Sequence, residues 1–317
     1  MRRLILRARR LAVVLLAVTF ATFVLASVLP GDVAYQMAGL NSSEAEVQAI
    51  REDLGLDRPV PVRYAAWAWD ALRGDWGVSP LNGEDVFEAV MGRLPASLEL
   101  MLLAQLMALG MAVPAALASA RRPGGRWDRA IGGAAFASVS MPSFMTGILL
   151  IFLFSLTLGW LPATGYTPFA EDPWANLRAM ILPALSLALV EWTVLMRTLR
   201  AEMIGVLQET YIALARAKGM SDARILLVHA LRPSSFSMIT VLGLQAARLM
   251  GGAIIIEQIF GIPGIGRLLI HAVNTRDFVM IQGCVTLFAV VFVAANFLVD
   301  LAYAWLDPRT RTEAAHG

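Results

Sequence analysis

The chain has 317 residues, of which 58% are hydrophobic and 16% are charged, with a net charge of +2. Soluble domains contain about 45–50% apolar and about 25% charged residues, so this composition, with a mean hydropathy of +0.65, predicts an integral membrane protein. A single cysteine, Cys284, excludes an internal disulfide framework, and the three histidines are too scattered for a helical His-x3-His metal pair. Lys218, the one lysine, is followed by Gly219, so the sequence has no Gly-Lys-Ser/Thr triplet of a phosphate-binding loop.

Long apolar runs predict six membrane-spanning helices, because a hydrocarbon core of about 30 Å needs about 20 helical residues. In chain order, the expected spans are 11–29, 96–120, 130–158, 179–196, 234–256 and 281–303. The first follows five arginines, as a cleaved signal peptide would, but its exit at residues 26–30 lacks an Ala-x-Ala cleavage site. Prolines within the spans, at Pro114, Pro142 and Pro183, predict kinks.

The distribution of basic residues predicts the orientation of these spans. Alternate connections on one side carry 17 Arg and Lys residues and those on the other side carry 8, so both termini are expected in the cytoplasm. The outer segment 30–95 carries 11 acidic and five basic residues. The positive charge of the whole chain therefore indicates membrane topology and not nucleic-acid binding.

Segment 30–95 has a pattern of its own. Residues 41–44 open a short, capped amphipathic helix that is expected to end at Gly55, before Pro59 and Pro61. An aromatic group follows, and it suits either an anchor at the outer leaflet or a ligand site. Its members are Tyr64, Trp67, Trp69 and Trp76.

The connection between the fourth and fifth expected spans, about 200–233, is the most informative stretch. Helix-forming residues from about 200 to 218 end at Gly219, which can supply a left-handed C-terminal position, and Ser221 suits the N-cap of the next helix. Two short helices would thus meet at a glycine corner. The pattern alone fits either a docking knob or a solvated hairpin that joins two spans.

This loop resembles the EAA-type coupling loop of binding-protein-dependent ABC importer permeases, in the Ala-Arg-Ala-Lys-Gly … His-Ala-Leu-Arg form of dipeptide and oligopeptide permeases. Ala213 stands where the general motif begins with Glu, and Pro233 falls one residue late, as in the peptide branch. Further matches follow in order along the chain, among them 30–32, 54–59, 74–79, 98–100, 141–144, 181–184, 243–245, 260–266, 276–278, 296–300 and 307–309.

The resemblance implies an all-α integral membrane protein with the type I ABC importer permease fold: six transmembrane helices and a small helical periplasmic insertion after the first. It divides the chain into a cytoplasmic N-terminus with the first helix (1–29), the periplasmic segment (30–95), the core permease domain (96–304) and a cytoplasmic tail (305–317). The implied location is the bacterial cytoplasmic membrane.

The resemblance also implies partners: a second homologous permease, two cytoplasmic ATPases that bind ATP and Mg, and a periplasmic or lipid-anchored solute-binding protein. No cofactor, metal, nucleic acid or catalytic site is expected on this chain. The residues expected to couple to an ATPase are Ala213, Ala215, Arg216, Ala217, Lys218, Gly219, Ser221 and Asp222.

Ionisable residues within spans are functional candidates, because each costs about 2.5–3.5 kcal/mol or more at mid-bilayer. Glu191 and Arg248 differ by about 10 Å in expected depth. They either stabilise helices through the backbone and Gln245, or line a pathway together with Gln245 in which Arg248 meets a substrate carboxylate. Glu99 and Asp300, at span ends, are expected to face lipid headgroups.

Peptides are the expected cargo, and nickel or other metal chelates, glutathione and oligosaccharides are alternatives carried by similar permeases. A stand-alone secondary transporter is a competing hypothesis, but it predicts inverted repeats or several buried charges forming an ion relay. A membrane enzyme is a third hypothesis, and no His/Asp/Glu cluster or nucleophile motif in the sequence supports it.

Overall fold

The computed structural model describes residues 2–28, 43–53 and 57–306. Within these ranges it contains helices and one isolated β-bridge, between Val78 and Asp85. The described residues fall in two compact units. The first is bounded by Met1–Ser97 and Pro263–Val293, and the second by Leu98–Ile262 and Ala294–Gly317. The predicted features at 30–32, 41–42, 54–56 and 307–317 lie outside the described residues.

The first unit contains helices from the N-terminal part of the chain together with α12 (Ile265–Thr275) and the start of α13 (Phe278–Leu306), which lie near its C-terminal end. The N-terminal helices are α1 (Arg2–Val28), α3 (Glu44–Asp53), α4 (Val60–Ala71) and the start of α5 (Val86–Arg121). A capping box begins α3: the Ser43 N–H donates to Glu46 Oε2 at 2.8 Å, and the Glu46 N–H donates to Ser43 Oγ at 3.3 Å. These bonds to Ser43 lower the pKa of the Glu46 carboxyl group.

Members of the aromatic group after α3 differ in exposure: Trp69 is 58% exposed, whereas Tyr64 and Trp76 pack against other aromatic rings. The Tyr64 ring on α4 lies 5.1 Å from the Phe20 ring on α1, and its hydroxyl lies 2.8 Å from Thr19 Oγ1. Trp76 is 8% exposed and stacks edge-to-face on Phe87. The expected leaflet anchor is therefore wrong for Trp76, which is a core residue.

Two expected motifs of the first unit, 74–79 and 276–278, meet in space. The Ser79 hydroxyl donates to Asp277 Oδ2 across 198 residues of sequence. The other carboxylate oxygen of Asp277 accepts from the Met280 N–H at 3.0 Å, which caps the start of α13. The motifs thus serve to fix the start of this helix.

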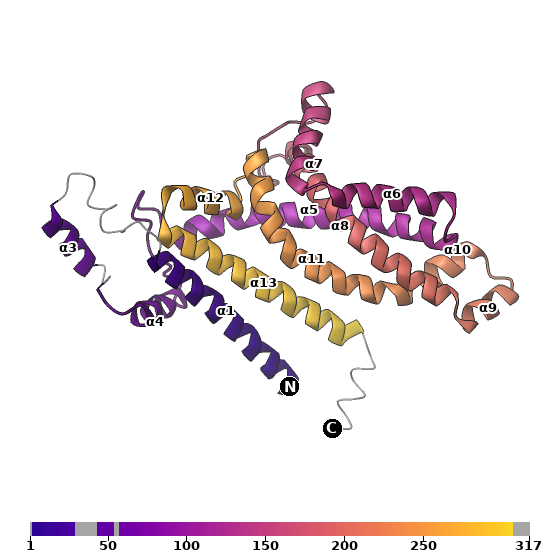
Figure 1. Ribbon diagram of the computed structural model, residues 1–317, viewed down its shortest axis with the longest axis horizontal. Coiled ribbons are helices and arrows are strands. Elements are labelled where there is room, and N and C mark those ends of the chain that lie inside the picture. Colours follow the sequence, from indigo (N-terminus) through magenta and orange to yellow (C-terminus); the bar gives the residue numbers. More distant parts are fainter. Residues whose placement is uncertain (1, 29–42, 54–56, 307–317) are drawn as a thin grey trace. The chain divides into compact units, whose positions relative to one another are not determined.

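The second unit is built around α8 (Pro173–Leu207), which packs against the helices that precede and follow it in the chain (Figure 1). Its other elements are the end of α5, α6 (Arg126–Ser140), α7 (Ser143–Leu150), the π-helix η1 (Ile151–Thr157), α9 (Thr210–Ala217), α10 (Asp222–Arg224), the π-helix η2 (Ile225–Ala230) and α11 (Leu231–Phe260). Buried alanines of α5 and large apolar residues of α8 form its main core.

The expected span 130–158 is a bent helix pair and not one continuous helix. The chain forms α6, then bends by 102° into α7 and η1 (Figure 1). The break falls at Met141 and Pro142, and Met141 is extended, with φ −110° and ψ 127°. A residue before proline is disfavoured in the helical region, so α6 ends there. At Pro183 the helix α8 continues, as a kinked span can.

By length and composition, four helices of the described residues can cross a membrane, or up to six if each of two bent helix pairs counts as one span. The long ones include α5, α8 and the described apolar part of α13. The apolar part of α1 that is described, Ala12–Leu25, is shorter than a span.

Candidate functional site

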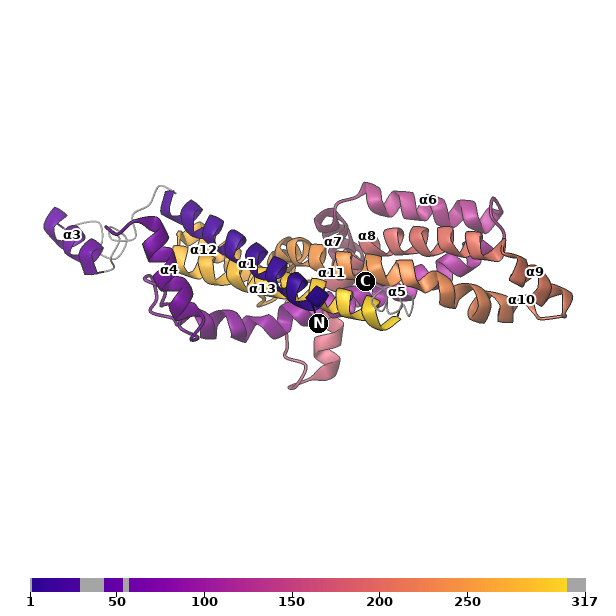
Figure 2. The same ribbon diagram turned by 90° about the horizontal axis from the view of Figure 1, so that it is seen from below.

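The expected docking loop is a helical elbow formed by α9, α10 and the turn between them (Figure 2). The helix expected over 200–218 is interrupted, because α8 ends at Leu207 and Glu209 is extended, with ψ 147°. Gly205 lowers the helix propensity just before this break. The interruption lets α9 turn back and pack on η2.

The corner of the elbow is a Schellman motif around Gly219. This residue has φ +78°, in the left-handed region that favours glycine. Its N–H donates to the Arg216 carbonyl at 2.9 Å, and the Met220 N–H donates to the Ala215 carbonyl at 3.2 Å. A Cβ added to Gly219 would meet no heavy atom within 4 Å. A larger residue here would therefore strain the backbone without a collision.

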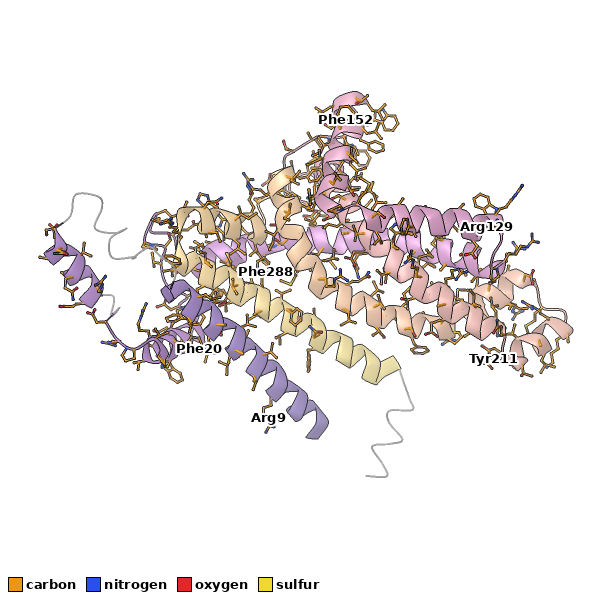
Figure 3. The ribbon with its side chains drawn as sticks, in the orientation of Figure 1. Arg9, Phe20, Arg129, Phe152, Tyr211 and Phe288 are labelled. Carbon is orange, nitrogen blue, oxygen red and sulfur yellow. The ribbon has the colours of Figure 1, made fainter. Side chains whose placement is uncertain are left out.

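The elbow is held together by apolar contacts between its two arms. Its small core consists of Ile212, Ala215 and Ile225, with Leu207 and Met220 packed against them. The Tyr211 hydroxyl also donates to the His229 carbonyl at 3.2 Å, and Figure 3 shows Tyr211 on this end of the second unit. These contacts attach α9 to η2, which follows directly after α10, and so hold the two arms together.

Seven of the eight residues expected to couple to an ATPase are exposed: Ala213, Arg216, Ala217, Lys218, Gly219, Ser221 and Asp222. The eighth, Ala215, is 7% exposed and belongs to the small core. Ser221 occupies the expected N-cap position of α10, but its side chain makes no capping hydrogen bond. The surface offers two cationic side chains of this set beside one carboxylate.

Sequence reasoning missed the polar contacts behind the elbow. Asp128 on α6 forms an ion pair with Arg200 on α8, at 2.7 Å between Oδ2 and Nη2. Arg121, the last residue of α5, lies 3.9 Å from the Asp222 carboxylate. In the sequence, these contacts were indicated only by the position of the four residues next to expected spans on the same, arginine-rich side.

The three candidate pathway residues lie at and behind the surface of the second unit. Gln245, on α11, is 2% exposed, and its Nε2 donates to the Glu191 carbonyl on α8 at 3.0 Å. Glu191 is 7% exposed, and its Oε2 accepts no hydrogen bond from the described residues. Arg248 is exposed and forms no ion pair with another side chain in the described part of the chain.

Glu99 has a protein partner and does not simply face headgroups. The Tyr166 hydroxyl donates to Glu99 Oε2 at 3.0 Å. Burial, together with this hydrogen bond, raises the pKa of Tyr166 to about 12. The loop after η1 is therefore attached to α5 by a neutral donor and a carboxylate.

The described residues contain no group of three or more His, Cys, Asp or Glu side chains placed to hold a metal ion. The exposed side chains of the elbow are cations, small residues and one carboxylate, and they surround a small apolar core, so they are suited to contact a protein surface.

Comparison with known protein families gives two matches. A model described as the binding-protein-dependent transport system inner membrane component matches residues 112–312, and a model for the N-terminal part of such components matches residues 1–101. The chain belongs to this family. It is an inner-membrane permease subunit of an ABC importer, as its motifs predicted.

Relatives of this permease match over nearly their whole length. A peptide transport system permease protein of Brucella abortus is 41% identical over 298 residues, which cover 94% of this chain and 95% of the relative. The oligopeptide permease AppB of Bacillus subtilis is 35% identical, with 93% and 95% covered. The glutathione permease GsiC of Salmonella choleraesuis is 36% identical, with 94% of each chain covered.

Two solved transporters share the fold of the permease. An amino acid ABC transporter gives a TM-score of 0.50 at 18% identity, covering 67% of this chain and 91% of that chain. The methionine transporter MetNI gives 0.54 at 14% identity, covering 67% and 93%. At these identities the likeness concerns the fold, and the expected all-helical ABC importer permease fold is confirmed.

Proposed function

We propose that this permease moves peptides into the cytoplasm and that its elbow docks on an ATPase. The observation that carries the proposal is the geometry of the elbow: a left-handed glycine corner, a small apolar core and a projecting set of exposed residues. A rigid convex corner of this kind suits insertion into a groove on a partner.

The ATPases, two per complex, bind ATP and Mg and drive the transport. The sequence itself has no Gly-Lys-Ser/Thr triplet that would cradle phosphates, so the nucleotide belongs to the partner chains. A second, homologous permease completes the membrane pathway, and a periplasmic or lipid-anchored binding protein delivers the cargo. Both termini and the elbow face the cytoplasm, as the arginine distribution indicates.

Support for a peptide cargo comes from the names of the relatives. Two of the three relatives above are named as permeases for peptides or oligopeptides, and the third is named for glutathione. Glutathione is therefore the second candidate cargo. Metal chelates and oligosaccharides have no comparable support.

Within the pathway, Arg248 is the residue that meets the carboxylate of a peptide. It is exposed on α11, whereas Gln245 and Glu191 are buried behind it and join α11 to α8. An intramembrane guanidinium persists only where it is paired, hydrated or facing a cavity, and a water-filled pathway supplies such a place.

The test is reconstitution of the chain in vesicles with its paired permease, ATPases and binding protein, followed by measurement of labelled-peptide uptake. Uptake that requires ATP and the binding protein is the expected result. Ion-driven uptake by this chain alone would overturn the proposal and establish a secondary transporter. Uptake of glutathione but of no other peptide would overturn the general peptide cargo.

A further inference from the structure

A partly buried ionic cluster joins three helices of the second unit near the base of the elbow. Arg200 Nε lies 2.8 Å from Asp128 Oδ1, and Arg200 Nη2 lies 2.7 Å from Asp128 Oδ2. This bidentate arrangement is the strong form of an arginine–carboxylate contact. The Asp128 side chain is 12% exposed, so solvent screens this pair less than it screens a pair on the surface.

The same carboxylate accepts from two further groups. Ser119, near the end of α5, hydrogen-bonds to Asp128 Oδ1, and the Gly124 N–H donates to Oδ2 at 2.7 Å. Arg200 Nε also donates to Ser119 Oγ at 2.9 Å. One carboxylate therefore fastens the end of α5, the turn after it and the start of α6 to α8.

The shape of that turn depends on its glycines. Gly124 has φ +76°, and a Cβ on Gly125 would lie 2.9 Å from the Arg122 carbonyl oxygen. In this turn the Gly124 N–H points at Asp128. Its backbone conformation, with φ positive, is unfavourable for most residues other than glycine.

One face of α5 next to this cluster carries alanines, while larger α5 side chains such as Met111 and Leu117 pack at the edge of the same core. Four alanines at four-residue spacing lie in the core and are at most 2% exposed: Ala108, Ala112, Ala116 and Ala120. A methyl group forms no hydrogen bond or ion pair, so these alanines supply no directional contact. The ionic cluster at the end of this face supplies the directional contact that the alanines lack.

The cluster lies close to the elbow along α8. Arg200 precedes the last residue of α8, Leu207, by about 10 Å of helix, and α9 begins after two further residues. A separate contact joins the elbow directly to α5: Arg121 lies 3.9 Å from Asp222, with side chains 58% and 64% exposed. Such exposed pairs contribute little, so the Asp128–Arg200 cluster is the stronger connection.

We propose that Asp128 and Arg200 are positioning residues that make the α5–α6 turn move together with α8 when the elbow is displaced. This inference rests on the proposed docking function of the elbow. The pair contacts neither nucleotide nor cargo; it transmits the displacement to α5 and α6. Without it, α8 moves without the α5–α6 turn, and ATP is hydrolysed with less cargo moved.

Two variants test this in the reconstituted complex. Arg200→Lys keeps the positive charge but removes the planar fork, and Asp128→Asn keeps the size but removes the charge. The readout is peptide transported per ATP hydrolysed, measured beside the thermal stability of the complex. Each variant is expected to lower this ratio by about threefold or more, as residues along a coupling network do, with little change in stability.

The double variant is expected to lower the ratio no further than the more affected single variant, because both changes remove one interaction. Arg93→Lys is the matched control. It alters the Arg93–Glu84 pair of the first unit, at 3.4 Å with side chains 33% and 39% exposed, and should leave the ratio unchanged.

An unchanged ratio in both single variants would overturn the proposal. So would parallel losses of uptake, hydrolysis and stability, which indicate a purely structural contact. If these complexes fail to assemble, Ser119→Ala removes one donor and leaves the bidentate pair; a smaller fall in the ratio supports the proposal, and no fall overturns it.

Gly219→Val alters the elbow itself, so it distinguishes failure of the proposed docking from failure of the proposed role of Asp128 and Arg200. If it lowers the ratio while Arg200→Lys does not, this inference alone fails. If it leaves the ratio unchanged, the docking function fails and the inference fails with it.

Discussion

At the scale of single residues, the proposed contact between Arg248 and the cargo can be tested. Its guanidinium lies at the surface of the second unit, three positions along α11 from the buried Gln245. We expect Arg248→Met to reduce uptake of a free-carboxylate peptide more than uptake of the same peptide with an amidated C-terminus. Methionine has a similar length and no charge, so the difference reports the carboxylate contact.

Arg197→Met is the control for this prediction, because it also removes an exposed cation from the second unit. It should affect both peptides equally. Equal effects of Arg248→Met on the two peptides, together with lower thermal stability, would contradict a cargo contact and assign Arg248 to helix packing.

The conformation of a single residue was predictable where the neighbouring sequence determines it. The left-handed corner at Gly219 follows from its place between two helical patterns, and it is confirmed. The Asp128–Arg200 pair was not predictable, since its members lie 72 residues apart and their meeting depends on how α6 packs on α8.

At the scale of elements, α7 is held by a close approach to α11. A Cβ on Gly147 would lie 3.1 Å from the Phe260 ring, so the helices meet through bare backbone. We expect Gly147→Leu to destabilise the permease by about 1–3 kcal/mol through overpacking, measured as unfolding in detergent.

Gly133→Leu on α6 provides the comparison, because no heavy atom lies within 4 Å of a Cβ there. This variant should change stability far less. Leucine has the higher helix propensity, so propensity alone would stabilise both variants. Similar losses for both would show that the contact with Phe260 does not decide the outcome.

Element boundaries were predictable where capping or breaking residues determine them. The start of α3 is an example, since the side chains of Ser43 and Glu46 form its capping box. The bend after Met141 was expected only as a kink, because apolar periodicity does not reveal that α7 packs on α8 and α11. Apolar length alone therefore overestimated the continuity of 130–158.

At the scale of the whole molecule, the arginine distribution predicts which segments face which side of the membrane. In a Cys284→Ala background, Leu81→Cys should react with a membrane-impermeant thiol reagent from the periplasmic side, and Ser221→Cys from the cytoplasmic side. Both native residues are exposed. Labelling of both cysteines from the same side would contradict the predicted orientation.

The all-helical class was predictable because the composition and the long apolar runs are typical of membrane-spanning helices. The family was predictable because its motifs occur in order along the chain. The division into two compact units was not, because the first unit joins residues up to Ser97 with Pro263–Val293. Contacts such as Ser79 to Asp277 hold that unit together, and a local sequence pattern does not predict contacts between residues so far apart.

The central claim is that the elbow couples ATP hydrolysis to transport, and Gly219 tests it most directly. Valine at φ +78° strains the corner, whereas asparagine tolerates the left-handed region, and neither meets a neighbouring atom at Cβ. The measurement is peptide transported per ATP hydrolysed in the complete reconstituted complex. We predict that Gly219→Val lowers this ratio severalfold while Gly219→Asn stays near the native value. A native ratio in Gly219→Val, with normal stimulation of hydrolysis by the binding protein, would contradict the account.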